Sequence, residues 1–280
     1  MKQIFKGFVT NKKEGRKPLL HWLVKIVPPD ILAAVMKWHY YRIVRSITEK
    51  QIEDLKIGRY FVDSNDYVID VGSNVGVYTK ILSKWVGNQG RVYSIEPIPT
   101  TFEILTHNIN RLKLNNINSI NSAISDVAGI VTMEIPKNDL GIENHYLAQV
   151  IKAPILPSSE VYHIKSCTLD ELFSCNQHRV SFIKIDTEGH ELPCIKGARE
   201  TISRWKPVLL IEISSDLAKK RSEGYQLNEI LKKYGYHPFC FNGVSVSKWH
   251  PGETSVNYFF FTSDHIDGLK RQNLYSIFNG

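Results

Sequence analysis

The sequence predicts an α/β fold in which a mostly parallel sheet carries helices on both faces. From Tyr67 onward, short apolar runs alternate with segments of helical periodicity, and strands that alternate with helices form parallel sheets. The last two apolar runs, at 237–241 and 257–262, are joined without a clear helix, which predicts an antiparallel hairpin at one edge. With 280 residues, 42% of them hydrophobic, the chain is long enough to bury one sizeable core.

The first elements are defined by the residues that end them. The run YVIDV at 67–71 is predicted as a strand because it is apolar and leads directly into glycine. The helical segment that follows, at 78–86, ends at Gly87. The run at 91–95 is a second strand, which Glu96 and Pro97 close.

The later elements are recognised by their periodicity. Apolar residues recur at helical spacing in 100–114, 191–204 and 227–234, and Thr168 caps a short helix at 169–173. The remaining predicted strands are the apolar runs at 117–124, 130–135, 180–186 and 208–214. Residues 136–163 contain prolines and little periodicity, so we expect a lid-like loop there.

Composition argues against a membrane-spanning or secreted protein. No run of about 18 apolar residues occurs, so we expect no transmembrane helix. Lys25, Pro28 and Pro29 interrupt the apolar stretch near the N-terminus, which does not have the layout of a secretory signal. The cysteine spacing matches no zinc or thioredoxin pattern. We therefore expect four reduced thiols in a cytoplasmic protein, namely Cys167, Cys175, Cys194 and Cys240.

A turn containing two glycines follows the first predicted strand. In VIDVGSNVG, Asp70, Gly72 and Gly76 are spaced Asp-x-Gly-x-x-x-Gly. Glycines allow a tight turn and close approach of a ligand, and the next helix presents free N–H groups. Asn74 and Val77 stand where the dinucleotide fingerprint has glycine, which disfavours a nicotinamide-dependent oxidoreductase.

An acidic residue, Glu96, ends the second predicted strand, 26 residues after Asp70. A carboxylate at this position can accept hydrogen bonds from both hydroxyls of a ribose. Together with the glycine turn, Glu96 predicts a nucleoside-containing ligand beyond the carboxyl ends of the strands. The alternative is an ordinary strand-to-helix turn beside a solvated strand end.

These residues resemble the class I S-adenosylmethionine-dependent methyltransferases. The run Asp70, Val71, Gly72, Ser73, Asn74, Val75, Gly76 resembles their first motif, and Glu96 followed by Pro97 resembles their ribose-binding acid. Asn121, Ser122 and Ala123 follow the third strand, where this class contacts adenine. The resemblance implies a Rossmann-like fold with a mostly parallel seven-stranded sheet, and S-adenosyl-L-methionine as cofactor.

The order of several further motifs resembles the FkbM family of methyltransferases. The motifs are VIDVGSNVG, SIEP, Thr168-Leu169-Asp170, FIKIDTEGHE, Lys196-Gly197-Ala198 and KPVLLIEI. The resemblance runs from about residue 64 to residue 213, is weak over 136–163 and is absent from the first 50 residues. It implies transfer of a methyl group to oxygen, commonly to a hydroxyl of a sugar, glycan or macrolide.

Charged residues are concentrated in the segment FIKIDTEGHE. Alternate residues of a strand face opposite sides, so Lys184 and Asp186 share one face. A buried lysine needs a carboxylate nearby to keep its charge, and Asp186 or Glu212 on the next strand can supply one. We therefore predict a structural role for Lys184 rather than a catalytic one.

Asp186, Glu188 and His190 follow that strand, where the reactive end of the methyl donor would lie. We predict that His190 is the general base, because an unperturbed pKa near 6.5 suits this task, with Glu188 and Asp186 as alternatives. Asp186 would also contact the cofactor, and Glu188, His190 and Glu212 would bind the acceptor. The alternative for His190 is a helix position that faces solvent. Glu191 is predicted to be a negative charge at the start of that helix, where the helix dipole favours it.

A metal site is a further interpretation of the same residues. Asp186, Glu188, His190 and Glu212 offer oxygen and nitrogen ligands of the kind that bind Mg²⁺ or Mn²⁺. Their spacing is not diagnostic of a metal site, and we predict none.

Positive charge is concentrated in the first 60 residues. The chain has a net charge of +7. Residues 1–60 contain 13 Lys and Arg and 5 Asp and Glu, a balance of +8, whereas residues 61–280 contain 22 Lys and Arg and 23 Asp and Glu, a balance of −1. We therefore divide the chain into a basic, amphipathic helical extension at 1–60 and a methyltransferase domain at 61–280. Within the extension, residues 19–45 combine aromatic, aliphatic and basic side chains, which suits peripheral contact with a membrane surface. The alternative is that these helices pack over the sheet or build part of the acceptor pocket.

The sequence thus predicts an S-adenosylmethionine-dependent O-methyltransferase that acts on a sugar, glycan or glycolipid-like acceptor. Two other interpretations remain: a nicotinamide-dependent oxidoreductase, and a non-catalytic protein that binds nucleic acid through the basic extension. The near-neutral main domain offers no broad basic face, so we predict no nucleic-acid partner.

Overall fold

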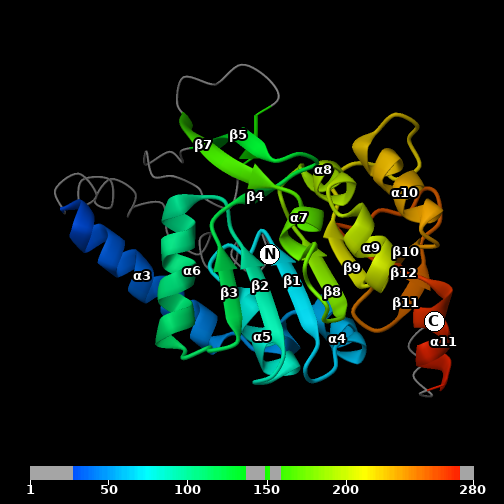
Figure 1. The fold of residues 1–280 in the computed structure, drawn as a ribbon, viewed down its shortest axis with the longest axis horizontal. Helices are drawn as coiled ribbons and strands as arrows, with labels where there is room; N and C mark the ends of the chain where they lie inside the picture. The colour runs from blue at the N-terminus through cyan, green and yellow to red at the C-terminus, as the bar shows by residue number, and fades with distance from the viewer. Residues whose placement is uncertain (1–27, 137–148, 152–158, 272–280) are drawn as a thin grey trace, which may run out of the picture.

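An eight-stranded sheet runs through the centre of the molecule in the computed structural model (Figure 1), which describes residues 28–136, 149–151 and 159–271. Its strand order is β11-β10-β12-β9-β8-β1-β2-β3. The strands are β1 (Tyr67–Val71), β2 (Arg91–Ile95), β3 (Ile117–Ile120), β8 (Val180–Ile185), β9 (Val208–Glu212), β10 (His237–Phe241), β11 (Val246–Lys248) and β12 (Asn257–Phe261). The five strands from β9 to β3 are parallel, and β12, β10 and β11 join antiparallel at one edge.

The mostly parallel α/β fold is confirmed, with one strand more than the seven predicted. The short strand β11 pairs with β10 and extends the antiparallel edge beyond the expected hairpin. The two late strands pair with each other as expected, and β12 also pairs with β9. This edge is therefore built from three antiparallel strands.

Helices cover both faces of the sheet and enclose two separate cores. They are α3 (Pro29–Ser46), α4 (Glu53–Gly58), α5 (Val77–Val86), α6 (Pro99–Arg111), α7 (Leu169–Phe173), α8 (Glu191–Lys196), α9 (Arg199–Trp205), α10 (Glu223–Lys233) and α11 (Ser263–Arg271). One core joins α3, α4, α5 and α6 to one face of the sheet, and the other joins α7, α8, α9 and α10 to the opposite face. In β8, Phe182 belongs to the first core, whereas Ile183 and Ile185 belong to the second, as the predicted alternation requires.

A second, four-stranded sheet lies next to the main one, with the order β4-β7-β5-β6 (Figure 1). Its strands are β4 (Ala123–Ile124), β5 (Gly129–Pro136), β6 (Gln149–Val150) and β7 (Ser159–Cys167). The prediction of a loop throughout 136–163 was therefore wrong for β6 and for the start of β7. The predicted strand at 117–124 is also divided, since β3 joins the main sheet and β4 joins this one. Residues 137–148 and 152–158, which belong to the predicted lid, lie outside the described residues.

Two helical predictions need correction. The predicted helix at 191–204 is divided into α8 and α9 at Gly197, where a Cβ atom would lie 2.0 Å from the backbone oxygen of Ser125. The segment after β12, for which no helix was predicted, forms α11. The four cysteines are free thiols, as expected.

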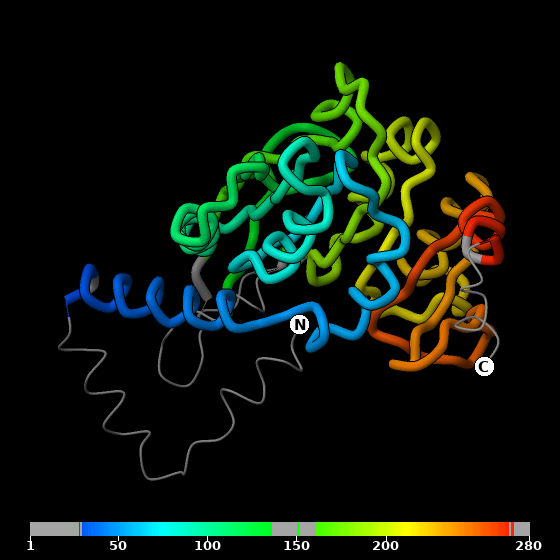
Figure 2. The backbone as a smooth tube through the Cα atoms, turned by 90° about the horizontal axis from the view of Figure 1, so that it is seen from below, coloured from blue at the N-terminus to red at the C-terminus, as the bar shows by residue number. Residues whose placement is uncertain are grey.

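The described part of the predicted extension is largely helical, and its second half belongs to the core of the main domain. Ile43, Val44 and Leu55 are buried in the same core as α5. The first turns of α3 instead project beyond the body of the molecule (Figure 2). Residues 1–27 lie outside the described residues. Within the parts of the chain that the structure describes, no helix is both long and apolar enough to span a membrane.

Candidate active site

A cavity opens where β1, β2 and β8 end and where the small sheet borders the large one. It encloses ≈ 720 Å³ of space, part of it open to solvent. Polar and backbone groups line it at Gly72, Asn74, Glu96, Pro97, Ser122, Asp186, Thr187, Glu188 and His190. Apolar side chains complete the wall, namely Val71, Ile95, Ile98, Ala123, Ile124, Met133 and Val150. An apolar cavity with a few convergent polar groups is the usual form of a small-molecule site.

The turn after β1 brings the backbone of two strand ends together. Gly72 has a φ of +75°, and a Cβ atom on it would lie 1.9 Å from the backbone oxygen of Asp186. The N–H groups of Gly72 and Ser73 donate to the carbonyl oxygen of Ile95, over 2.9 and 3.0 Å. The N–H of Asp186 donates to the carbonyl oxygen of Val71 over 3.1 Å. Glycine is therefore required at position 72, because any side chain would separate the ends of β1 and β8.

Glu96 reaches the cavity from the end of β2 and organises the backbone around it. Its carboxylate accepts hydrogen bonds from the N–H groups of Asn74 (2.9 Å) and Ile98 (3.0 Å). The Nδ2 of Asn121 donates to the carbonyl oxygens of Glu96 and Pro97, over 2.8 and 2.9 Å, and so fixes this strand end. Burial raises the pKa of Glu96 to about 7, against the opposing effect of the two N–H groups and of the Lys184 charge.

Lys184 is buried beneath the glycine turn, between two carboxylates. Its Nζ lies 3.3 Å from Oδ2 of Asp186 and 3.6 Å from Oδ1 of Asp70, and 4.7 Å from the ring centre of Tyr78. Burial lowers the pKa of Lys184, but the attraction of Asp186 and Asp70 outweighs this, so its pKa is raised. The structural ion pair with Asp186 is confirmed. Asp70, on the neighbouring strand, is a second partner that the sequence interpretation missed, because β1 and β8 pair Asp70 with Lys184.

We expect the change of Lys184 to methionine to lower the free energy of unfolding by about 3–5 kcal/mol, because it leaves buried carboxylates without a counter-charge. Chemical denaturation measures this loss. Lys232, in an exposed pair with Glu229 at 2.6 Å, provides the control, and its change to methionine should alter stability by no more than about 0.5 kcal/mol. Adding Asp70→Asn to the Lys184 variant should restore part of the loss. A decrease below about 1 kcal/mol for Lys184→Met would contradict a structural role.

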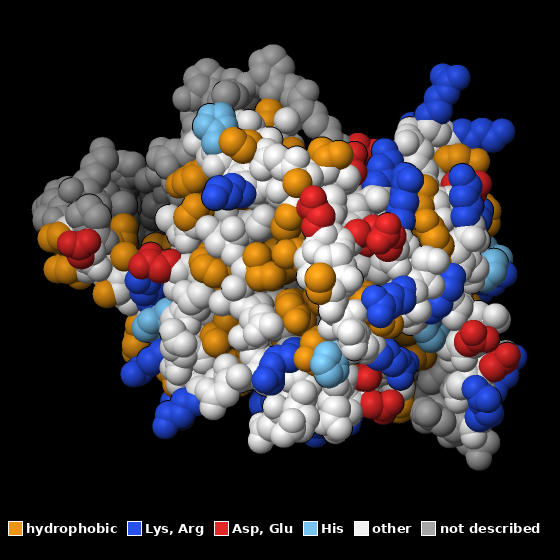
Figure 3. Space-filling model, viewed as in Figure 1, with side chains coloured by type: hydrophobic (Ala, Val, Ile, Leu, Met, Phe, Trp, Pro, Cys, Tyr) orange, Lys and Arg blue, Asp and Glu red, His pale blue; other side chains and the backbone are white. Residues whose placement is uncertain are grey.

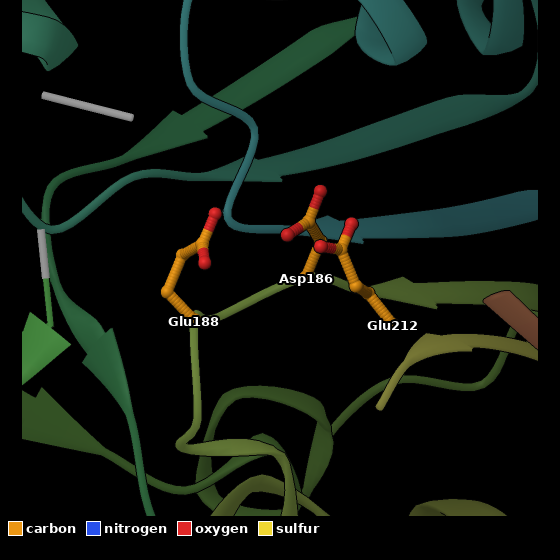
Figure 4. Close-up of side chains that lie close together, drawn as sticks. All are labelled: Asp186, Glu188 and Glu212. Carbon is orange, nitrogen blue, oxygen red and sulfur yellow. The ribbon is translucent and has the colours of Figure 1, made fainter. Parts of the chain in front are cut away.

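Three carboxylates converge at the cavity edge: Asp186 after β8, Glu188 in the following loop and, behind Asp186, Glu212 at the end of β9 (Figure 4). We call these three residues the acidic rim. Each offers an oxygen within 4.8 Å of the others. Burial, followed by the negative charges of Asp186 and Glu188, raises the pKa of Glu212 to about 7. One proton can therefore be held in the rim near neutral pH.

His190 is buried, with 7% of its surface exposed, and stands at the start of α8. This excludes the alternative in which it faces solvent. Its Nε2 lies 3.0 Å from the hydroxyl of Ser125, which in turn lies 3.2 Å from Oδ1 of Asp126. If the hydroxyl donates to Asp126, it accepts from Nε2, and Nδ1 becomes the basic nitrogen of the neutral ring. His190 thus belongs to a hydrogen-bonded chain and stands apart from the acidic rim, so the four-residue metal set suggested by the sequence is not assembled.

Glu191 holds the loop that carries Glu188, although the sequence suggested only a helix-start charge. Its Oε1 accepts hydrogen bonds from the N–H groups of Gly189 (2.9 Å) and Thr187 (3.2 Å) and from the Thr187 hydroxyl (3.1 Å). Glu191 is 6% exposed. Glu188 itself has a φ of +52°, an unusual value for a residue with a side chain. The loop is therefore fixed in one shape by a buried carboxylate.

The structure brings most of the predicted site residues to the cavity. Those that line it are Gly72, Asn74, Glu96, Pro97, Ser122, Ala123, Asp186, Glu188 and His190. Five do not line it: Asp70, Ser73 and Gly76 lie beneath the turn, Asn121 braces the end of β2, and Glu212 adjoins Asp186. Asp70 is fully buried, and its Oδ2 accepts a hydrogen bond from Thr79 over 2.6 Å, so it shapes the turn from below. The apolar lining from the small sheet, at Met133 and Val150, had no signal in the sequence.

Comparison with known proteins now identifies the family. Residues 70–238, more than half of the chain, match the FkbM methyltransferase domain. The chain belongs to the FkbM methyltransferase family. It is therefore a methyltransferase that uses S-adenosylmethionine, and the family assignment decides against an oxidoreductase and against a non-catalytic protein.

The chain is similar to several proteins that carry methyltransferase names. The chain is 27% identical over 176 residues to the hexuronic acid methyltransferase AglP of Haloferax volcanii, covering 61% of this chain and 67% of that one. A solved FkbM methyltransferase of Methylobacillus flagellatus is 19% identical, with a TM-score of 0.45 over 71% of this chain. The match spans only 44% of that structure. A methyltransferase of Aquifex aeolicus is 18% identical, with a TM-score of 0.39, covering 75% of this chain and 87% of that one.

The cavity of this FkbM methyltransferase fits the methyl donor. Glu96 presents carboxylate oxygens that a ribose diol can use, and among the described residues that line the cavity none is a lysine or arginine that would select for phosphate. The apolar wall suits a purine ring, and the acidic rim suits the ammonium group at the other end of the donor. At Gly72 the backbone itself forms the wall, so a ligand can approach it closely.

Proposed function

We propose that this FkbM methyltransferase transfers a methyl group to a hydroxyl oxygen of a sugar, glycan or glycolipid-like acceptor. The observation that carries the proposal is the acidic rim at the cavity. Carboxylates accept hydrogen bonds from the several hydroxyls of a carbohydrate, and they repel an acceptor that presents its own carboxylate. The name of AglP, a hexuronic acid methyltransferase, supports a sugar acceptor. A hexuronic acid carries a carboxylate as well as hydroxyls, and because the rim repels the carboxylate, we propose that the acceptor presents hydroxyls to the rim.

In this proposal each part of the cavity holds one part of the donor. Glu96 binds the ribose hydroxyls, and Ser122 and Ala123 lie against the adenine. The Gly72 turn and Asp186 hold the methionine end, while Asp70, Ser73, Gly76 and Asn121 keep the backbone in position. When bound, S-adenosylmethionine supplies a methyl group activated by the positive charge on its sulfur.

The chain's remaining site residues position and activate the acceptor. Glu188 and Glu212 hold its hydroxyl groups, and His190 takes the proton of the reacting hydroxyl. Correct positioning can lower the barrier by roughly 7–11 kcal/mol, so the fixed loop at 187–189 is as important as the base. Met133 and Val150 of the small sheet line the same cavity, so this sheet would contribute to the acceptor pocket.

The proposal is tested with S-adenosylmethionine carrying a radiolabelled methyl group, incubated with cell glycan and glycolipid fractions. We expect label in carbohydrate, in a form that resists mild base, because a methyl ether is stable under conditions that hydrolyse a methyl ester. Base-labile label would mean a carboxyl acceptor and would overturn the assignment to a hydroxyl. Transfer to protein or nucleic acid alone would overturn the sugar acceptor.

We expect the affinity for S-adenosylmethionine to decrease as the pH falls below 7. The ionised form of Glu96 accepts both ribose hydroxyls, and its pKa is raised to about 7. Protonation on the acid side of this pKa therefore removes the binding-competent form, and the Kd at pH 6 should be about fivefold higher than at pH 7. Calorimetric titration from pH 6 to pH 8 measures it. Glu96→Gln should bind weakly at every pH, whereas Glu212→Gln, which removes the other carboxyl that titrates near 7, should keep the dependence. A flat profile for the wild-type protein would be incompatible with this role of Glu96.

We expect excess EDTA to leave the rate of methyl transfer unchanged. The acidic rim resembles a cation site, but part of its charge is already offset by Lys184, 3.3 Å from Asp186, and by the proton that Glu212 can hold. We therefore expect no divalent ion to be needed for the remaining charge, which an ammonium group of the donor can meet. The assay compares the untreated enzyme, the enzyme in EDTA, and EDTA-treated enzyme after addition of Mg²⁺ or Mn²⁺. Loss of activity in EDTA that Mn²⁺ restores would establish a metal requirement instead.

A further inference from the structure

Helix α3 presents one continuous exposed face. Its members recur at steps of three and four residues, so they align along one side of the helix. Ile31, Val35 and Trp38 are exposed by 55%, 54% and 56%, which is unusual for large hydrophobic residues. We call this face the α3 stripe, made up of Ile31, Ala34, Val35, Trp38, Arg42 and Arg45.

The opposite side of α3 is held by the rest of the domain, which fixes the direction of the stripe. Ile43 and Val44 are buried in the core, and Met36 and Tyr40 pack against it. Lys37 pairs with Glu103 of α6 over 2.8 Å, and Arg111 of α6 lies over the ring of Tyr41. Since α3 is anchored along this side, the stripe faces away from the body of the molecule. Figure 2 shows the first turns of α3 projecting past α6, and Figure 3 shows hydrophobic side chains gathered at this end.

The stripe divides into an apolar part and a basic part. Its apolar members occupy the first half of α3, beside the exposed Asp30 of the first turn, and the two charged residues of its second half, Arg42 and Arg45, are both basic. The guanidinium of Arg42 lies 4.8 Å from the ring centre of Trp38, which joins the two parts. Basic residues beside exposed aliphatic and indole groups are the composition of helices that lie at the boundary of headgroups and acyl chains.

Other occupants fit the stripe less well. Nucleic acid would satisfy the arginines but would give Ile31 and Val35 no apolar surroundings. A second copy of the chain, seated on its own stripe, would bury arginines against arginines or against apolar side chains, which is costly for charged groups. An anionic bilayer satisfies both parts at once. The sequence adds attraction from the same end of the chain, since residues 1–60 carry a balance of +8 from 13 basic and 5 acidic residues.

We propose that the α3 stripe docks this methyltransferase on the surface of an anionic lipid bilayer. Ile31, Val35 and Trp38 enter the level of the headgroups and upper acyl chains, and Arg42 and Arg45 lie against the lipid phosphates. The proposal concerns α3 only and does not depend on the identity of the methyl acceptor.

The test uses the full-length chain and vesicles of either phosphatidylcholine alone or phosphatidylcholine with phosphatidylglycerol. We expect sedimentation with the anionic vesicles, little with the neutral ones, and weaker binding at high salt. The triple variant Ile31→Ser, Val35→Ser, Trp38→Ser should lose at least about tenfold in affinity, since three large apolar side chains no longer enter the membrane. Arg42→Gln with Arg45→Gln should lose about fivefold for each charge removed.

Matched controls separate the stripe from general surface effects. Val244→Ser alters an apolar residue that is 83% exposed elsewhere, and Lys219→Gln with Lys220→Gln removes two exposed charges from another loop. These controls should bind vesicles like the wild-type protein, and all variants should bind S-adenosylmethionine normally, which establishes that they are folded. Equal vesicle binding by the triple variant and the wild type would overturn the proposal. The proposal would also be overturned if the protein did not bind vesicles but formed a dimer, or bound an oligonucleotide, and the triple variant lost that property.

Discussion

Changing Gly72 to alanine should strongly weaken the binding of the methyl donor. We expect Gly72→Ala to weaken S-adenosylmethionine binding at least about a hundredfold, because the ends of β1 and β8 must separate and the donor site is built on both. The new Cβ atom would lie 1.9 Å from the backbone oxygen of Asp186, and backbone cannot move aside as a flexible side chain can. A φ of +75° adds strain for alanine, worth about 1–2 kcal/mol.

Calorimetry and thermal unfolding with and without S-adenosylmethionine test this prediction. Gly235, at the end of α10, gives a matched control, since its φ is +85° and nothing lies within 4 Å of the position of a Cβ atom. Gly235→Ala therefore carries the conformational strain without the collision and should bind the donor normally. If Gly72→Ala binds within threefold of the wild-type protein, the glycine turn is not the wall of the donor site.

Strand ends are the part of this site that the sequence describes best. Apolar runs locate β1, β2 and β8, and the residues that follow a parallel strand reach the carboxyl edge of the sheet, where ligands bind. The sequence alone therefore assigns Gly72, Glu96 and Asp186 to one site at the carboxyl edge of the sheet. Alternation in β8 also predicted that Lys184 lies on the opposite face from Ile183 and Ile185. The two cores agree with this alternation, since Phe182 belongs to one core and Ile183 and Ile185 to the other.

Contacts between distant segments are the part that could not be predicted. Asp70 and Lys184 meet because β1 and β8 are neighbours in a particular register, and no local pattern encodes that register. The small sheet was missed for a similar reason, since β5 and β7 pair across a segment with little periodicity of its own. Glu191 does begin a helix as predicted, but its contacts with the loop were missed because a carboxylate in the first turn of a helix already has an ordinary explanation. Its actual partners are the N–H groups of the preceding loop.

The largest loss of turnover should follow the removal of the general base. We expect His190→Gln to lower turnover by about 10²–10⁴-fold while donor binding is retained, because proton removal by a positioned base contributes a factor of this size. His190 is favoured over Glu188 by its setting, since the imidazole is buried at the cavity and oriented by Ser125 over 3.0 Å. Glu188 belongs to the acidic rim, so Glu188→Gln should mainly raise the KM for the acceptor.

Steady-state kinetics over a range of pH separate these two roles. With S-adenosylmethionine held at saturation at every pH, so that the titration of Glu96 does not limit the rate, the wild-type rate should fall on the acid side and His190→Gln should lose this limb of the profile. Ser125→Ala, which removes only the partner of Nε2, should lie between the two. His250, on an exposed turn with 71% of its side chain in solvent, provides the control for the same substitution and should leave the kinetics unchanged. Wild-type turnover in both the His190 and the Glu188 variants would exclude either residue as the base. A large loss of turnover in Glu188→Gln alone would instead identify Glu188, in the acidic rim, as the general base.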